Sequence, residues 1–78
     1  MVKTRTTYRE LEVVAIPENL PEFGIEAGTT GTIVTIYDEG HMLDVEVSKD
    51  GATVGFADLE VAEDGSLSFV AFTPLTSQ

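Results

Sequence analysis

The sequence predicts an all-β domain, a small barrel of about five antiparallel strands in a meander. Runs of β-branched, aromatic and alternating apolar residues recur along the chain, as expected of half-buried strands. Turns made of acidic residues and glycine separate these runs at Asp38-Glu39-Gly40, Asp50-Gly51 and Asp64-Gly65. No window of adequate length has the 3.6-residue apolar period of a helix. A small sheet of this kind curls to hide its edges, which favours a barrel over a sandwich.

The length and composition predict one domain with unstructured ends. Seventy-eight residues hold a single hydrophobic core. We expect a flexible basic arm at 1–9, the barrel domain at 10–75 and a tail at 76–78. Cysteine is absent, which excludes disulfides and thiolate chemistry. No apolar run reaches the roughly 18 residues of a membrane helix, and no apolar stretch follows the basic N-terminus. We therefore expect a cytoplasmic protein.

The charge is strongly acidic and unevenly distributed. Fourteen acidic residues oppose four basic ones, and the formal net charge is −10. Lys3, Arg5 and Arg9 all lie in the first nine positions, so the rest of the chain contains Lys49 as its one basic residue. Such a body repels phosphate backbones and attracts basic partners. The alternative is that the charge only keeps the protein soluble and monomeric.

The first strand is expected at 10–16, and Pro17 ends it because proline cannot donate to the sheet. The loop 17–24 follows, and in it Leu20 and Phe23 are apolar enough to pack back onto the barrel. The apolar residues of the first strand fall on both of its faces, which predicts burial on both sides near its end: Leu11, Val13 and Ala15 on one face, Val14 and Ile16 on the other.

Four further strands are expected at 32–37, 41–48, 52–61 and 66–72. Gly55 is expected to mark a bulge or a bend in the fourth strand of the chain. In the last strand, the apolar residues are again expected to alternate without interruption: Leu67, Phe69 and Ala71 on one face, Val70 and Phe72 on the other.

Two glycines precede the second strand, and they have two interpretations. Gly28 and Gly31 could bring backbone N–H groups close to an anion. However, no helix follows and no lysine is near, so both phosphate-loop and dinucleotide-binding motifs are absent. We therefore expect Gly28 and Gly31 to be structural turn residues that supply positive φ angles.

The stretch around these glycines resembles the turn and strand of KOW-type and other SH3-like barrels. The residues that carry the resemblance are Ile25, Ala27, Gly28 and Gly31, followed by Thr32-Ile33-Val34. Residues 10–47 also resemble a family of small bacterial proteins of unknown function, with a Glu-Leu-x-Val-Val strand, a Leu-Pro loop and a Gly-x-x-Gly turn. The resemblance implies an SH3-like barrel and no chemistry, and it leaves an antitoxin or immunity role open. The Asp64-Gly65 hairpin departs from the family, as do the threonines at 29 and 30 where an acidic residue is common.

Paired carboxylates are the strongest candidate for a binding site. Asp44 and Glu46 share one strand face, as do Asp58 and Glu60, so neighbouring strands would line one surface with four acids. The alternative is an outer face that is merely solvated. His41 is the single histidine, and we interpret it as part of a solvated turn. The carboxylates beside it suggest at most weak Ca²⁺ or Mg²⁺ binding, and no serine lies in a nucleophile-elbow context. We expect no cofactor, no metal and no enzyme activity.

We carry three hypotheses for function. The first is a non-catalytic interaction module that docks a basic protein through its acidic face, with an antitoxin or immunity protein as one form. The second is an accessory subunit or assembly factor that docks through the apolar loop at Leu20 and Phe23. The third is a KOW-like barrel that binds nucleic acid through Lys3, Arg5 and Arg9.

Overall fold

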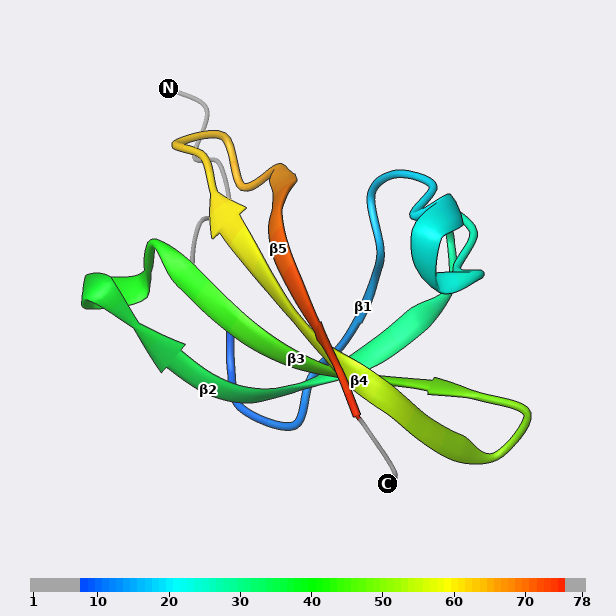
Figure 1. Cartoon of the computed structure of the whole chain (residues 1–78). Coiled ribbons are helices and arrows are strands. Elements are labelled where there is room, and N and C mark those ends of the chain that lie inside the picture. Colours follow the sequence, from blue (N-terminus) through cyan, green and yellow to red (C-terminus); the bar gives the residue numbers. More distant parts are fainter. Residues whose placement is uncertain (1–7, 76–78) are drawn as a thin grey trace.

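The computed structural model describes residues 8–75, so most of the predicted arm and the whole predicted tail lie outside the described residues. Within 8–75 the chain forms one antiparallel sheet in the order β1-β2-β3-β4-β5 (Figure 1), which confirms the predicted all-β meander. Two one-turn 3-10 helices, Pro21–Phe23 and Asp38–Gly40, lie in the connections. The strands of the described chain are β1 (Val13–Ala15), β2 (Thr30–Tyr37), β3 (Met42–Lys49), β4 (Ala52–Val61) and β5 (Leu67–Pro74).

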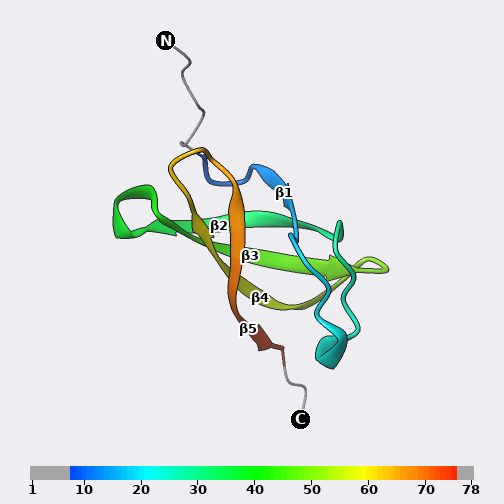
Figure 2. The same cartoon turned by 90° about the horizontal axis from the view of Figure 1, so that it is seen from above.

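The sheet is strongly twisted and folds over its own inner face. In Figure 2, β5 runs steeply across the direction of β2 and β3. Strands that cross in this way can bury a shared set of side chains without a second layer. The core consists of apolar residues from β1 to β4 and the first loop: Val14, Ile16, Leu20, Ile25, Ile33, Leu43, Val45, Val47, Ala57, Leu59 and Val61.

The first strand is shorter than predicted and is buried on one side. Glu10 and Leu11 form a turn with a φ of 73° at Leu11, so extended backbone begins only at Val13. Leu11 and Val13 are 77% and 62% exposed, while Val14 faces the core. The prediction of burial on both sides was wrong, because Leu11, Val13 and Ala15 are all exposed on the face of β1 that points away from the core.

The two turn glycines have different roles, and one prediction is corrected. Gly28 lies in the turn before β2 with a φ of 92°, as predicted. Gly31 lies inside β2, opposite Val14 and Val47, and does not have a positive φ. A Cβ at Gly31 would meet Val45 Cγ1 at 2.5 Å and the Glu46 carbonyl oxygen at 2.8 Å. Gly31 is therefore required because β3 approaches too closely for a side chain, whereas Gly28 is required by its positive φ angle.

The β3–β4 hairpin agrees closely with the sequence. Asp50 and Gly51 both have positive φ, 54° and 82°, as a two-residue type I′ turn requires. Gly55 was predicted to mark a bulge or a bend. The bulge falls one residue earlier, because Val47 pairs with Gly55 and Ser48 with Thr53, which leaves Val54 as the extra residue.

The last strand differs from the predicted alternation because of a second bulge. The register of β4 and β5 shifts between the pairs Asp58–Ala71 and Leu59–Phe69, which leaves Val70 as the extra residue. The bulge reverses the alternation after Val70, so Phe72 packs on the core side with Leu67 and Phe69. The prediction that placed Phe72 on the opposite face from these residues was wrong.

Two contacts join the ends of the sheet in the described chain. Tyr8, which the sequence assigned to the arm, packs against the core, and its hydroxyl donates a 2.6 Å hydrogen bond to the Gly65 carbonyl. At the other end, the rings of Phe23 and Phe72 lie 4.5 Å apart between centroids. The first contact joins the segment before β1 to the turn between β4 and β5. The second joins the loop between β1 and β2 to β5.

Candidate functional site

The four predicted acids lie on neighbouring strands, on the outer face of the sheet. Asp44 on β3 is directly opposite Asp58 on β4, which confirms that these strands are neighbours. Glu46 and Glu60 follow on the same side, opposite Phe56 and Met42 respectively. Their alternation with fully buried residues of β3 and β4 places them away from the core. We call Asp44, Glu46, Asp58 and Glu60 the acidic face.

Asp44 and Asp58 form the centre of this face. Partial burial raises the pKa of Asp44, and the charge of Asp58 and a hydrogen bond to Asp58 raise it further. A carboxylate directly opposite another disfavours its ionisation, because the two like charges repel. Asp44 therefore takes up a proton more readily than an isolated aspartate as the pH falls.

Tyr37 closes one side of the pair. Partial loss of solvent raises the pKa of the Tyr37 hydroxyl, and the Asp58 carboxylate adds to this through its charge and a hydrogen bond. The charges of Asp44 and Asp38 raise the pKa of Tyr37 again. The Tyr37 side chain is 41% exposed, so its ring is accessible beside the carboxylates. Sequence reasoning missed Tyr37, whose one signal was an aromatic residue at the end of a strand before two acids.

The two outer acids differ in their surroundings. Glu46 is half-buried, and its Oε2 accepts a hydrogen bond from the Thr53 hydroxyl on β4. Glu60 is exposed at its position opposite Met42. The acidic face therefore combines a hydrogen-bonded carboxylate at Glu46, two facing carboxylates at Asp44 and Asp58, and an exposed carboxylate at Glu60. This arrangement can accept hydrogen bonds from a cationic group, and such a group would relieve the repulsion between Asp44 and Asp58.

The loop residues predicted as an alternative docking surface are largely used inside the molecule. Leu20 is 5% exposed and belongs to the core. Phe23 is half-buried and packs on Phe72. Leu20 therefore offers almost no surface to a partner. Of the two predicted docking residues, only Phe23 has an exposed part that a partner could contact.

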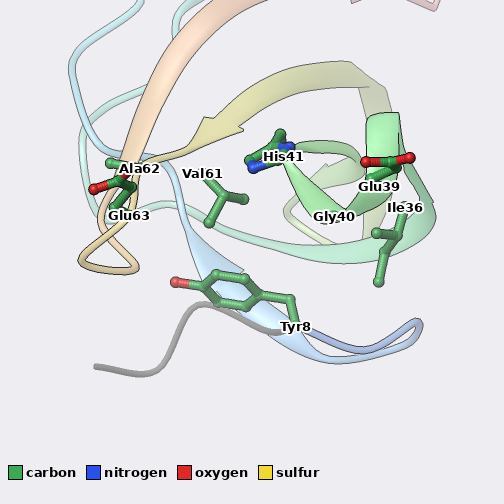
Figure 3. Close-up of a pocket in the computed structure, with 8 residues that line it drawn as sticks. All are labelled: Tyr8, Ile36, Glu39, Gly40, His41, Val61, Ala62 and Glu63. Atoms are coloured by element: carbon green, nitrogen blue, oxygen red, sulfur yellow. The ribbon is translucent and has the colours of Figure 1, made fainter. Parts of the chain in front are cut away.

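A pocket of about 400 Å³ opens at the end of the sheet near the β2–β3 turn (Figure 3). Val61 and Ile36 form apolar wall, and the Tyr8 ring lies across the opening. His41 also lines the pocket, and its Nδ1 lies 3.0 Å from the Asp38 carbonyl oxygen. Sequence reasoning missed this pocket because its residues come from three separate segments: Tyr8, Ile36, Glu39, Gly40, His41, Val61, Ala62 and Glu63.

The described residues contain neither a cluster of metal ligands nor a membrane helix. No group of three or more His, Cys, Asp or Glu side chains in 8–75 is arranged to hold a metal ion. None of the helices in this range has the length and apolar character needed to cross a bilayer.

The comparisons with known proteins give a family and no activity. The family model described as "Domain of unknown function (DUF4926)" matches residues 10–63. The matched residues contain β1 to β4 with the whole acidic face, and they end before β5. Neither the curated proteins nor the solved structures contain a match to this chain.

Proposed function

The chain belongs to the DUF4926 family of unknown function, and from the geometry of its acidic face we propose that it is a non-catalytic module that docks a basic protein. The observation that carries the proposal is the placement of Asp44 directly opposite Asp58. Like charges at such a position destabilise a sheet by about 0.2–1 kcal/mol. Proteins retain costly arrangements of this kind where a functional site needs them.

The partner is expected to present arginine or lysine side chains. A guanidinium group over the Asp44–Asp58 pair would neutralise the repulsion between the two carboxylates. Glu46 and Glu60 extend the negative surface to either side along the strands. The exposed Tyr37 ring adds a flat surface on which a guanidinium can stack.

The net charge supports the same partner class. A chain of net charge −10 attracts basic proteins over a distance and accelerates their encounter. An antitoxin or an immunity protein that covers a basic toxin is one form that such a module takes. An antitoxin and an immunity protein of this kind would both act by docking to a basic surface.

Affinity capture with a paired variant tests the proposal. The wild-type chain and the variant Asp44→Asn with Asp58→Asn are immobilised and exposed to a lysate of the native cell. We expect the wild type to retain a basic protein that elutes at about 1 M salt, where the Debye length is about 3 Å. The variant should retain much less of it, because both hydrogen-bond acceptors at the centre of the face have lost their charge.

A charge-matched control separates the acidic face from overall charge. Glu18→Gln with Glu22→Gln removes two exposed carboxylates from the β1–β2 loop and leaves the acidic face intact. This control should retain the basic protein at wild-type levels. Equal losses in both double variants would mean that net charge alone drives capture, and equal retention in all three chains would place the binding surface elsewhere.

We also propose that the fold is an SH3-like barrel. The support is the strand order, the long first loop and the contacts that join the ends of the sheet, Tyr8 with Gly65 and Phe23 with Phe72. Nuclear Overhauser contacts in solution between these two pairs would test the assignment. A sheet that lacks both contacts would be open, and the assignment would then be incorrect.

A further inference from the structure

The end of the chain is unlike the rest in its charge. From Ser66 to Gln78 the sequence contains no Asp, Glu, Lys or Arg, although charged residues make up 23% of the chain. This stretch contains β5, which lies at one edge of the sheet. In the described chain β5 pairs with β4 on one side, and no strand pairs with its other side.

The two edges of the sheet contrast sharply. An exposed edge strand is a template for pairing with another chain, and proteins protect edges by short length, charge, proline or bulges. The β1 edge is three residues long and is flanked by Glu10, Glu12 and Glu18. The β5 edge is eight residues long and without charge. Its protection consists of the Val70 bulge in the middle and Pro74 at the end.

Apolar surface is exposed along the same edge. Val70 is 50% exposed at the bulge, and Leu75 just beyond the strand is 56% exposed. Ser68, Ala71 and Thr73 are also exposed, and all are small enough to let another strand approach. The uncharged edge therefore has both free backbone groups and accessible apolar side chains.

We propose that β5 pairs with β5 of a second copy of this chain, antiparallel across a two-fold axis. Symmetric pairing places the same strand against itself, so any charge near the axis would meet an equal charge from the other copy. The β5 strand avoids this repulsion because it contains no charged residue. Two chains of net charge −10 repel over most of their surfaces. The β5 strand is the long edge where they can meet without placing like charges against each other. Pro74 has no N–H to donate, so the pairing involves residues 67–73.

The pairing is independent of the proposed basic partner and leaves its site accessible. Asp58 pairs with Ala71 across β4 and β5, so a continuous sheet would place two acidic faces on either side of the new β5–β5 seam. The two interactions also respond oppositely to salt. Screening weakens the docking of a basic protein, and it strengthens the association of two acidic chains.

Sedimentation equilibrium of the full chain tests the pairing. We expect a monomer–dimer equilibrium that shifts toward dimer when salt is raised from about 0.02 to about 0.5 M. Val70→Lys should raise the dimer dissociation constant by about tenfold or more, because the two-fold axis brings the two lysines together. The substitution lowers the net negative charge, so general repulsion between chains would change in the opposite direction.

A matched variant and a second measurement complete the test. Val13→Lys makes the same change at an exposed valine of the other edge and should leave dimerisation unchanged. In the wild type, amide exchange of residues 67–73 should slow as the protein concentration rises, which requires no variant to fold. A monomer at every concentration and salt, or equal loss of dimer in both lysine variants, would overturn the proposal. Concentration-independent exchange at β5 would overturn it as well.

Discussion

Asp44 is the residue at which the proposed binding role and folding stability oppose each other. Its side chain lies in a half-buried position opposite Asp58, and burial and that neighbour raise its pKa. Asp64, in the β4–β5 turn, shows the reverse case. Its pKa is lowered by hydrogen bonds from the Ser66 hydroxyl and the Ser66 backbone N–H. The two carboxyls therefore affect folding stability with opposite signs.

Replacing Asp44 should stabilise the protein and flatten one part of its pH profile. The folded-state pKa of Asp44 lies above the unfolded value of about 3.9, so the folded chain binds more protons between these values. The free energy of unfolding contributed by this group therefore falls as pH rises through that window. We expect Asp44→Asn to remove this dependence and to add about 0.5–1 kcal/mol at pH 7, measured by urea unfolding.

Asp64→Asn provides the comparison for this experiment. The lowered pKa of Asp64 means that its contribution is present above the unfolded pKa and is lost as pH falls through the folded pKa. We expect this variant to be less stable than the wild type at pH 7. Stabilisation by both substitutions would indicate a general effect of net charge rather than the local pair.

Gly31 is required as glycine by steric contact with β3 and not by a positive φ angle. We expect Gly31→Ala to lower the free energy of unfolding by about 2–3 kcal/mol, because its Cβ would meet Val45 and the Glu46 backbone. Thermal unfolding measures this, and binding of the basic partner by folded protein should be unchanged. Gly28→Ala, at a positive φ with open space, should cost about 1 kcal/mol. Wild-type stability for Gly31→Ala would contradict the close approach of β3.

At the scale of elements, sequence patterns predicted where the strands lie more accurately than which side of the sheet each side chain occupies. The alternation in β3 and the Asp50-Gly51 turn predicted that hairpin with small errors at its ends. The bulge at Val70 could not be predicted, because it depends on how β5 meets β4 rather than on local sequence. That one extra residue moved Phe72 to the core side.

Phe72 and Phe23 together fix the first loop against β5. We expect Phe23→Ala to lower the free energy of unfolding by about 2 kcal/mol, since a half-buried aromatic contact is lost. Chemical denaturation measures this. Binding of a basic partner should remain intact in the folded variant. Loss of binding with unchanged stability would instead favour docking through the loop.

At the scale of the whole molecule, the sequence predicted the fold class and the acids on neighbouring strands. It did not predict the contacts between residues that are far apart in the sequence. The acidic strands were found because alternation along β3 and β4 is local information. Tyr37 was missed because it reaches Asp58 from another strand. The pocket under Tyr8 was missed for the same reason. Charge also divides the molecule, into an acidic face on β3 and β4 and an uncharged edge at β5.

The proposed role of the acidic face is to bind a basic partner at a cost in folding stability. The most direct test measures both quantities in one pair of chains, the wild type and Asp44→Asn with Asp58→Asn. We predict that the captured basic partner binds the double variant at least about tenfold more weakly, while the variant is more stable by about 1 kcal/mol. Unchanged affinity for the partner, or a fall in affinity and stability together, would contradict the claim.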